Sequence, residues 1–414
     1  MSDKKRQLLV PHYMQQFACI GSACEDTCCA GWAVSIDQST YRKYNKVRDS
    51  VLKPLLDKKV TRNRTNPTDA NYAKIKLNED AKCPLLNETG LCKIQVQLGE
   101  ELLSDTCATY PRVTNQTNGV MERSASVSCP EIARLALLNP DGMEFDEIEE
   151  SADVRFRFTR RLDERTESAP DKAQKHFWEL RIISIQILQN RSYKLADRLV
   201  ILGMLFNKVQ EYVEAKRVDE IPLLIAEYTR LLEDGSMKAG LNSIPVLYAI
   251  QMEIMKGISD ERYVLGVNNS RYIECFTETL HGISYTENTP VEEIAERYKY
   301  AHDLYFKPLM DQHEYIMENY LVNYVFKNMF PFGGHPSVVD DYIIMVIHYA
   351  LIKLHLIGMS GFHKDAFCIE LVLKLIQSFA KSIEHSPLFL RKVYDLLKNN
   401  GYTSMAYMSI LIKN

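Results

Sequence analysis

The sequence lacks the glycine pattern of a doubly wound α/β fold. Such folds place a glycine-rich turn directly after the first strand, where the backbone must approach a bound nucleotide closely. No G-x-G occurs among the 414 residues, which include only 17 glycines, and apolar strands do not alternate with helices. We therefore expect no Rossmann-type fold.

The sequence also lacks an excess of positive charge. Lys and Arg number 50 against 54 Asp and Glu, which gives a formal net charge of −4 and a pI near 6.2. Nucleic-acid binding generally needs a basic surface. We therefore expect no nucleic-acid partner.

Long apolar runs are scarce as well. The N-terminal stretch MSDKKRQLLVPHYMQQ is basic, but no apolar run of secretory length follows it. The longest apolar stretch, 342–358, contains two histidines and a lysine and is too short to span a bilayer. We expect a buried helix at 342–358, no signal peptide, no membrane association and a cytoplasmic location.

Cysteine, by contrast, is abundant near the N-terminus. Of the ten cysteines, Cys275 and Cys368 stand singly in apolar helical contexts, and we expect them to pack as buried thiols. Clustered thiols in a large chain without an export signal bind metal more often than they form disulfides. The sequence therefore predicts a metal-binding role for the eight cysteines that precede residue 130: Cys19, Cys24, Cys28, Cys29, Cys83, Cys92, Cys107 and Cys129.

The spacing of these cysteines bears on which metal they hold. Zinc sites typically use C-x2-C pairs, often with histidine. Here the spacings are C-x4-C-x3-C-C and C-x8-C, and no histidine lies between Cys19 and Cys129. An all-thiolate site favours an iron–sulfur cluster, while structural zinc, disulfides and plain packing remain alternatives. Four ligands suffice for one cluster, so eight leave either a second metal site or a set of structural thiols.

Composition divides the chain into three parts. Residues 1–138 are cysteine-rich with short elements, residues 139–172 are polar with charges of both signs, and residues 173–414 repeat apolar side chains at spacings of three and four. We expect a mainly α fold, in which a small cysteine-rich metal-binding domain with short strands is joined by a charged, solvated connection to an all-α domain. Within the first part, the alternation at 70–77 predicts a short strand, and SCPEIARLALL at 128–138 predicts the start of a helix.

Several segments together resemble a known family. The motifs C-x4-C-x3-CC-x2-W, CPLLNETGLC, LSDTCATYPR and ERSASVSCPE resemble the cysteine-cluster domain of the flagellin lysine N-methylase family. The helical stretches at 178–203 and 317–332 are similar to segments that accompany that domain, whereas the cysteine pattern alone also occurs in a broader family of zinc- or iron-chelating proteins. The resemblance implies methyl transfer from S-adenosylmethionine to lysine amines of flagellin, the subunit of the bacterial flagellum, with a [4Fe-4S] cluster in the cysteine domain.

A methylase without a doubly wound sheet needs another way to hold S-adenosylmethionine. An iron–sulfur cluster with three cysteine ligands leaves one iron open to the amino and carboxylate groups of the methyl donor. Radical enzymes that bind the donor in this way carry C-x3-C-x2-C, whereas here Cys24-x3-Cys28 is followed directly by Cys29. A cluster that positions the donor for polar transfer is the hypothesis that agrees with both the cysteines and the missing glycines.

The segment after Cys107 offers one catalytic and one cofactor-binding candidate. A lysine amine has a pKa of about 10.4 in water, so transfer requires a desolvating pocket or a group that takes its proton. Tyr110 is a candidate for that group, and the fork of Arg112 matches the carboxylate of the methyl donor. The structural alternative is that both residues brace the loop.

The helical stretch 313–330 offers further candidates. Glu318, Asn319 and Asn323 interrupt an apolar helix, and asparagine is a poor helix former. Glu318 is a catalytic candidate, while Asn319 and Asn323, four residues apart on one face, are candidate cofactor-binding residues. Bonding to a neighbouring helix end is the alternative for the two asparagines.

Four other polar or aromatic residues are expected to be structural. Asp26 and Trp32 flank the cysteine run and are expected to cap it and pack against it. His348 and His355 lie seven apart on the apolar stretch 342–358 and are expected to be core residues.

The resulting interpretation is a protein-lysine methyltransferase that acts on flagellin. Two alternatives use the same cysteines: a non-catalytic metal-binding protein whose helices recruit a partner, and a redox sensor whose thiolates or labile cluster respond to oxidants. A methylase must also bind S-adenosylmethionine and admit a lysine side chain, so a pocket distinguishes it from the other two classes.

Overall fold

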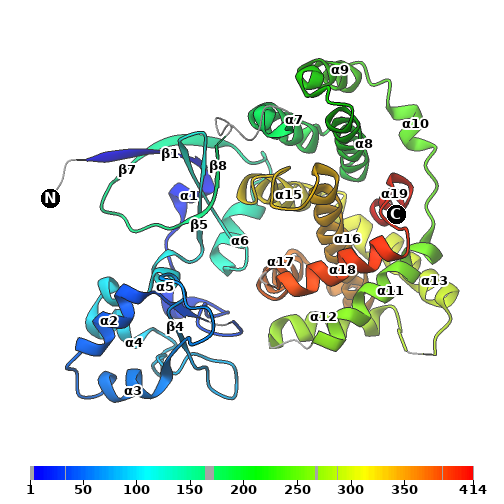
Figure 1. Cartoon of the computed structure of the whole chain (residues 1–414). Coiled ribbons are helices and arrows are strands. Elements are labelled where there is room, and N and C mark those ends of the chain that lie inside the picture. Colours follow the sequence, from blue (N-terminus) through cyan, green and yellow to red (C-terminus); the bar gives the residue numbers. More distant parts are fainter. Residues whose placement is uncertain are drawn as a thin grey trace. The chain divides into compact units, whose positions relative to one another are not determined.

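The computed structural model describes residues 4–32, 34–163, 172–265, 269–286, 288–384 and 386–413. The chain divides into two compact units, unit 1 with Met1–Ala133 and Phe145–Arg161, and unit 2 with Arg134–Glu144 and Leu162–Asn414 (Figure 1). Helices predominate, as the sequence predicts, and the described strands form two small sheets, neither of them doubly wound.

Unit 1 contains a five-stranded sheet in the order β7-β1-β6-β5-β8. Strand β1 pairs in parallel with β6 and antiparallel with β7. Strands β5 and β6 form a hairpin whose turn is Asn118-Gly119, both at positive φ, as a two-residue hairpin turn requires. The strand bounds are β1 Lys5–Pro11, β5 Arg112–Thr117, β6 Val120–Ala125, β7 Phe145–Ser151 and β8 Phe158–Leu162.

Two strands of this sheet come from the stretch 139–172, which the sequence predicts to be a charged connection. Its charges pair along the sheet: the carboxylate of Glu150 on β7 accepts hydrogen bonds from Arg6 on β1 and from Arg123 on β6. The two guanidinium groups hold the pKa of Glu150 below its usual value, although partial burial acts in the opposite direction. The mixed charge of this stretch therefore partly reflects pairing between strands. Residues 164–171 of the same stretch lie outside the described residues.

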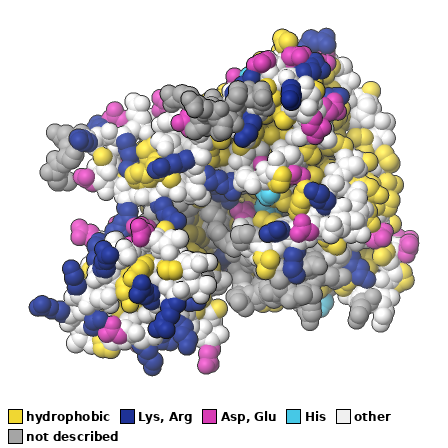
Figure 2. Space-filling view, viewed as in Figure 1, with side chains coloured by type: hydrophobic (Ala, Val, Ile, Leu, Met, Phe, Trp, Pro, Cys, Tyr) yellow, Lys and Arg dark blue, Asp and Glu magenta, His cyan; other side chains and the backbone are white. Residues whose placement is uncertain are grey.

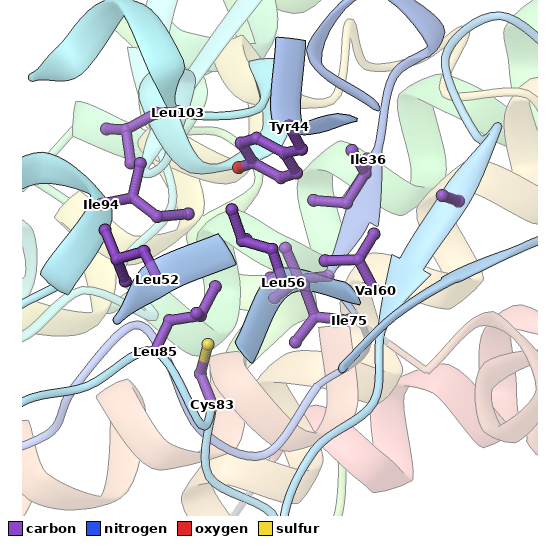
Figure 3. Packing of buried hydrophobic residues seen from close by; sticks show 12 residues of the cluster. Ile36, Tyr44, Leu52, Leu56, Val60, Ile75, Cys83, Leu85, Ile94 and Leu103 are labelled. Atoms are coloured by element: carbon purple, nitrogen blue, oxygen red, sulfur yellow. The ribbon is translucent and has the colours of Figure 1, made fainter. Parts of the chain in front are cut away.

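The cysteine-containing remainder of unit 1 is built around a second, three-stranded sheet in the order β2-β4-β3. Strand β4, Ala73–Ile75, lies within the alternating stretch 70–77 and confirms the predicted strand. Short helices surround an apolar cluster that includes Ile36, Tyr44, Leu56 and Cys83 (Figure 3). The bounds are β2 Ser35–Ile36, β3 Val60–Arg62, α1 Tyr13–Gln16, α2 Gln38–Lys46, α3 Leu52–Lys59, α4 Lys93–Leu98 and α5 Asp105–Thr109.

The outer face of this part is basic although the whole chain is slightly acidic. Figure 2 shows Lys and Arg side chains gathered over α2 and α3, and in residues 37–82 these residues outnumber Asp and Glu. Long Lys and Arg side chains can cover apolar surface while their charges remain in water. The local charge of this face thus differs in sign from that of the whole chain.

Unit 2 is helical throughout its described residues. The polar residues Asn190 to Ser192 interrupt the apolar periodicity of 177–217, which predicts a turn, and this turn separates α7 from α8. The bounds are α7 Phe177–Gln189, α8 Leu195–Glu214, α9 Ile221–Glu233, α10 Lys238–Asn242, α11 Tyr248–Leu265, α12 Ser270–Gly282, α13 Val291–Ala301, α14 Lys307–Met310, α15 Tyr315–Lys327, α16 Val338–His363, α17 Ile369–Phe379, α18 Pro387–Asn399 and α19 Met405–Ile412. Helix α6, Pro130–Leu137, begins in unit 1 and ends in unit 2, and it confirms the predicted helix start at Pro130.

Helix α16 forms the centre of unit 2. The segment Val338–Ala366 is long and apolar enough to cross a membrane, but its most apolar window is entirely buried inside the structure. This burial is typical of the core helix of a soluble bundle and confirms the buried helix predicted at 342–358. Gly282 of α12 and Gly358 of α16 allow these two helices to cross closely, since a Cβ built on Gly282 would lie 1.7 Å from the carbonyl oxygen of Gly358.

One predicted helix cap is wrong. The stretch NTPVEEIAERYKYAHDLY at 288–305 has the pattern of a capping box, which predicts Thr289 as the N-cap and Pro290 at the first helical position. In the structure, α13 begins at Val291 with Pro290 as the N-cap. The hydroxyl of Thr289 is instead hydrogen-bonded to that of Thr286 at 2.6 Å. The hydroxyl thus stabilises the preceding turn, a local bond that serine and threonine side chains often make in preference to capping.

Candidate functional site

Five of the eight predicted metal ligands form one group, called here the first thiol group: Cys28, Cys29, Cys83, Cys92 and Cys107. The sulfur atoms of Cys28 and Cys29 are 4.0 Å apart, and the thiols of Cys29 and Cys83 are hydrogen-bonded. Cys29, Cys92 and Cys107 pack against the apolar cluster to which Cys83 belongs. The group thus lines one side of the core of unit 1 and is drawn from four separate chain segments.

The remaining three, Cys19, Cys24 and Cys129, form a second thiol group. Cys129 precedes α6 and lies within electrostatic range of Cys24 and Cys19. The thiol of Cys24 donates to the carbonyl oxygen of Asp26 at 3.2 Å. The tertiary structure therefore divides the cysteine set in a way that the spacing along the chain does not indicate.

Thiols of both groups have raised pKa values. Burial raises the pKa of Cys107 to about 12 and that of Cys129 to about 11. Without a cation these thiols stay protonated, whereas coordination to a metal removes the proton. Among the described residues, no three His, Cys, Asp or Glu side chains stand close enough together to hold a single metal ion.

Two aromatic residues, Trp32 and Tyr110, lie near the first thiol group. The indole of Trp32 donates to the carbonyl oxygen of Cys28 at 2.8 Å, and its ring lies 5.6 Å from that of Tyr110. The hydroxyl of Tyr110 is hydrogen-bonded to that of Ser128 at 3.0 Å. Burial holds the pKa of Tyr110 well above its usual value, so its phenol stays protonated and is poorly suited to accept a proton.

Arg112, the cofactor-binding candidate next to Tyr110, is the first residue of β5. Its guanidinium lies over the ring of Phe17, 5.1 Å from the ring centre. This is the geometry of a cation–π contact. Arg112 belongs to unit 1, whereas Asn319 and Asn323 belong to unit 2, so the predicted cofactor-binding residues do not come from one unit.

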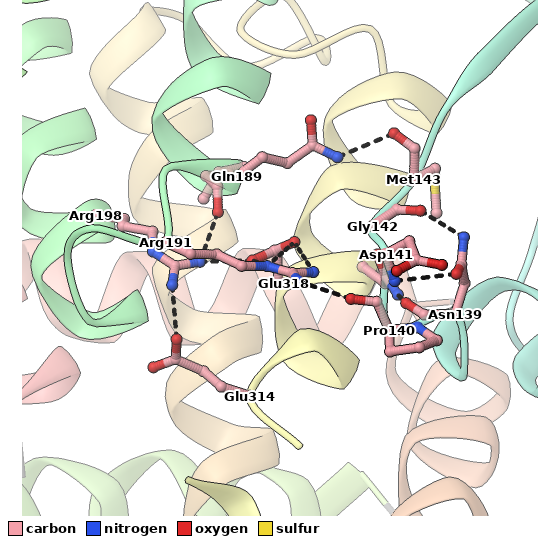
Figure 4. Close-up of polar contacts among 12 residues, drawn as sticks. Asn139, Pro140, Asp141, Gly142, Met143, Gln189, Arg191, Arg198, Glu314 and Glu318 are labelled. Atoms are coloured by element: carbon pink, nitrogen blue, oxygen red, sulfur yellow. Dashed lines mark hydrogen bonds and ion pairs between the residues drawn. The ribbon is translucent and has the colours of Figure 1, made fainter. Parts of the chain in front are cut away.

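Glu318 forms the centre of a buried ionic network in unit 2 (Figure 4). Its carboxylate accepts hydrogen bonds from Arg198 at 2.7 Å and from Arg191 at 2.9 Å. Arg198 also binds Glu314 at 2.7 Å and donates to the carbonyl oxygens of Tyr193 and Leu188. Both oxygens of Glu318 are thus engaged by guanidinium groups, an arrangement that fixes the ends of α7, α8 and α15.

The two asparagines on α15 are buried. The amide of Asn319 donates to the carbonyl oxygens of Leu137 and Asn139 at 3.2 and 2.8 Å, at and just beyond the end of α6. This is the bond to a neighbouring helix end that the sequence leaves open as an alternative. Asn323 is 2% exposed and lies one turn further along α15.

His348 and His355 lie in the core of unit 2, as predicted. His355 contacts the hydroxyl of Tyr272 at 3.1 Å and the carbonyl oxygen of Leu351 at 2.6 Å. The ring of His348 lies between those of Tyr324 and Phe379. Burial lowers the pKa of each histidine to about 4, so both are neutral at physiological pH.

Two cavities in unit 2 contain groups that sequence reasoning missed. A cavity of about 110 Å³ is lined by Lys353, whose amine donates to the carbonyl oxygen of Ile412 at 3.3 Å and whose pKa burial lowers to about 7. A larger cavity of about 370 Å³ is lined by His335, whose ring is bound by Asp341. The sequence FGGHPS at 332–337 shows only a helix end. The one sequence signal for a functional residue here is the histidine that follows two glycines. Asp341, its partner, is six positions further along the chain.

Comparison with known proteins places this architecture in a family. The family model of the FliB lysine N-methylase C-terminal domain matches residues 181–411, which lie within unit 2. A lysine-N-methylase of Salmonella typhimurium is 24% identical over 387 residues, which cover 91% of each chain. A lysine-N-methylase of Salmonella choleraesuis matches to the same extent.

A shorter relative aligns with part of the chain. The flagellar biosynthetic protein FliU of Salmonella muenchen is 32% identical over 159 residues, which cover 38% of this chain and 92% of that protein. No solved structure matches. Because the family model covers more than half of the residues, this chain belongs to the FliB lysine N-methylase family.

Proposed function

We propose that the protein transfers methyl groups from S-adenosylmethionine to lysine side chains of flagellin in the cytoplasm. The observation that carries this proposal is similarity to lysine N-methylases over 91% of both chains. The flagellar name of a third relative supports a flagellar protein as the substrate. The methyl donor supplies an electrophilic methyl group bound to sulfur, which a neutral lysine amine attacks.

We also propose that the first thiol group holds a [4Fe-4S] cluster. Its five cysteines exceed the four that one cluster needs, and four of them belong to or pack against a single apolar core. Cys28 and Cys29 are adjacent in sequence, and in this proposal one of the two is the fifth cysteine that does not bind the cluster. The second thiol group then either holds a second metal or stabilises the start of α6.

The five candidate ligands differ in burial: Cys83 is buried, Cys28 is exposed, and the other three are half-buried. Cys83 is 5% exposed and packs among aliphatic side chains, as Figure 3 shows. Cluster potentials depend on solvent exposure and on hydrogen bonds to sulfur. Cys83 and its apolar neighbours would therefore shield one side of the proposed cluster, while the side at Cys28 would face solvent.

Metal analysis of anaerobically purified protein tests the cluster. We expect iron and inorganic sulfide in the wild type and in Cys275→Ser, the control outside both thiol groups, and loss of both in Cys83→Ser. Loss in Cys129→Ser but not in Cys83→Ser would assign the cluster to the second thiol group. Zinc without sulfide would exclude the cluster and leave a structural metal domain.

A methylation assay tests the reaction itself. Wild-type protein, flagellin and S-adenosylmethionine labelled at its methyl group are incubated together, and flagellin is analysed by mass spectrometry for methyl-lysine. We expect labelled lysines on flagellin and none when the protein is omitted. Absence of label with cluster-loaded protein would refute the proposed activity.

A further inference from the structure

A histidine–aspartate pair lies in the loop between α15 and α16. The Nδ1 atom of His335 is 2.6 Å from the Oδ1 atom of Asp341. The other carboxylate oxygen of Asp341 accepts the backbone N–H of Gly333 at 2.9 Å. The side chain of Asp341 is 4% exposed, whereas that of His335 is 36% exposed. The pair thus has a buried carboxylate and a ring that reaches the surface.

The loop is shaped to hold this ring in place. After α15 the chain passes through Met329 at φ +57° and Gly334 at φ +104°, both in the left-handed region. A residue with a side chain in this region costs about 1–2 kcal/mol relative to the right-handed one. Asp341 lies in the first turns of α16, a long and buried helix. The carboxylate that orients His335 is therefore attached to a long helix that is largely buried in unit 2.

The histidine lines a cavity large enough for a substrate side chain. The cavity has a volume of about 370 Å³, within the range of small-molecule sites. Its apolar walls include Val213 on α8, Pro331 and Phe332 of the loop, and Val338 at the start of α16, with Gln174 and Gln210 as polar neighbours. The walls offer methylene chains an apolar surface next to a proton acceptor.

We propose that His335 is the general base of the methyl transfer, and that the cavity beside it receives the acceptor lysine. This inference rests on the proposed lysine methylation. The Nδ1–H group of His335 donates to Asp341, which leaves Nε2 to accept a proton. The ammonium of the acceptor loses one proton to Nε2, and the neutral amine then forms a bond to the methyl carbon while the carbon–sulfur bond of the donor breaks. The donor leaves as a thioether.

Two effects make the proton transfer feasible although lysine is the stronger base in water. Apolar walls disfavour the charged ammonium and lower its pKa, as burial does for Lys353 in this same unit. The carboxylate of Asp341 stabilises the imidazolium that forms. Because the ring is one-third exposed, His335 passes the proton to water after each turnover.

The other groups near His335 are compatible with this role. Lys172 lines the same cavity and is the cation among its lining residues. Asp340 precedes Asp341, and the hydroxyl of Tyr394 donates to its carboxylate, so this second acid is engaged away from the ring. Asp341 is therefore the carboxylate that orients His335.

The test variant is His335→Asn. Its amide keeps an N–H donor near the position of Nδ1, so the bond to Asp341 and the loop are retained while the proton acceptor is lost. We expect the kcat for flagellin methylation to fall at least about 100-fold, the usual contribution of a general base, with KM for flagellin changed less than about 3-fold. The matched control is His363→Asn, which removes a histidine paired with Glu278 at 3.1 Å but absent from the cavity lining; it should retain the wild-type rate.

A second variant separates catalysis from folding. In His335→Ala, added imidazole should restore at least about 10-fold of the lost rate, because the cavity admits the ring in place of the missing side chain; a merely structural role would give no rescue. Unchanged kcat in His335→Asn, or a loss of rate in His335→Ala that imidazole does not restore, would overturn the proposal while the wild type remains an active methylase. An inactive wild type would overturn the proposed function, and this inference with it.

Discussion

Replacement of Glu318 by glutamine should destabilise unit 2 without altering any reacting group. The carboxylate of Glu318 is 1% exposed and joins Arg198, itself 2% exposed, to Arg191, whose side chain is 44% exposed. Glutamine keeps the shape and one acceptor oxygen. It removes the charge and turns an N–H₂ group toward two guanidinium groups that cannot accept a hydrogen bond.

The cost follows from the two arginines separately. Breaking a buried ion pair by removing one partner costs about 3–5 kcal/mol, because the other charge stays buried. Arg198 retains Glu314 at 2.7 Å and two backbone carbonyl oxygens, which places the loss near the lower limit. The exposed Arg191 adds at most about 1 kcal/mol. We therefore expect Glu318→Gln to lower the free energy of unfolding by about 3 kcal/mol.

Urea denaturation with a local probe measures this loss. Of the two tryptophans, Trp32 lies in unit 1 and Trp178 in α7 of unit 2, so a Trp32→Phe background reports unit 2 alone. With a urea slope of about 3 kcal/mol per molar, the midpoint should fall by about 1 M. In a double-mutant cycle with Arg198→Met, the combined loss should be at least about 1.5 kcal/mol smaller than the sum of the single losses.

A midpoint within about 0.3 M of the background protein, at an unchanged slope, would refute this reasoning. If that variant also lost methylation activity, Glu318 would be a catalytic residue, as the sequence allows. A stability loss accompanied by activity that returns when the temperature is lowered would confirm a structural role.

Two further predictions concern the core of unit 2. Gly282→Ala should lower the free energy of unfolding by more than about 2 kcal/mol, because its Cβ would meet the backbone carbonyl of Gly358. The control Gly240→Ala has open space around its Cβ and should be neutral or stabilising by up to about 1 kcal/mol. Equal urea midpoints for the two variants would contradict this packing. Lys353→Met should stabilise unit 2 at pH 7 and flatten the pH dependence of its stability. Burial lowers the pKa of Lys353 from 10.5 to about 7 in the folded state, so the unfolded chain binds more protons than the folded one between pH 7 and 10.5. The free energy of unfolding of the wild type should therefore rise with pH across that window, by at most about 1.4 kcal/mol per pH unit. Urea midpoints of both proteins at pH 7, 8 and 9 measure the difference, and parallel pH profiles would show that Lys353 is charged when folded.

Much of the local structure follows from the sequence because its causes are local. The break between α7 and α8, the start of α6 at Pro130 and the short strand at Ala73–Ile75 each depend on a few neighbouring residues. The apolar run at 342–358 can only be stable when buried, so its place in the core also follows. Likewise, His348 and His355 are surrounded in sequence by apolar residues and share their burial.

The sequence does not show which side chains become neighbours in the folded protein. In the sequence, four of the eight cysteines form one run at 19–29, whereas the structure divides the eight thiols into two groups because Cys83 and Cys129 reach different neighbours in the folded unit. Asn319 binds a carbonyl at the end of α6, which lies 182 residues away. A buried amide without a hydrogen bond costs free energy whichever partner is missing. Helix packing therefore decides which distant group becomes its partner.

The sequence by itself determined the type of secondary structure, from its periodicity, and the reactive side chains, a set of thiols without histidine. It also showed the resemblance to lysine methylases. Only the tertiary structure decided that β7 and β8, from a charged stretch, complete the sheet around β1 and β6. It also brought His335 onto Asp341 beside an apolar cavity. The physical reason is that periodicity reports the burial of one face, whereas the pairing of polar groups depends on which surfaces the burial brings together.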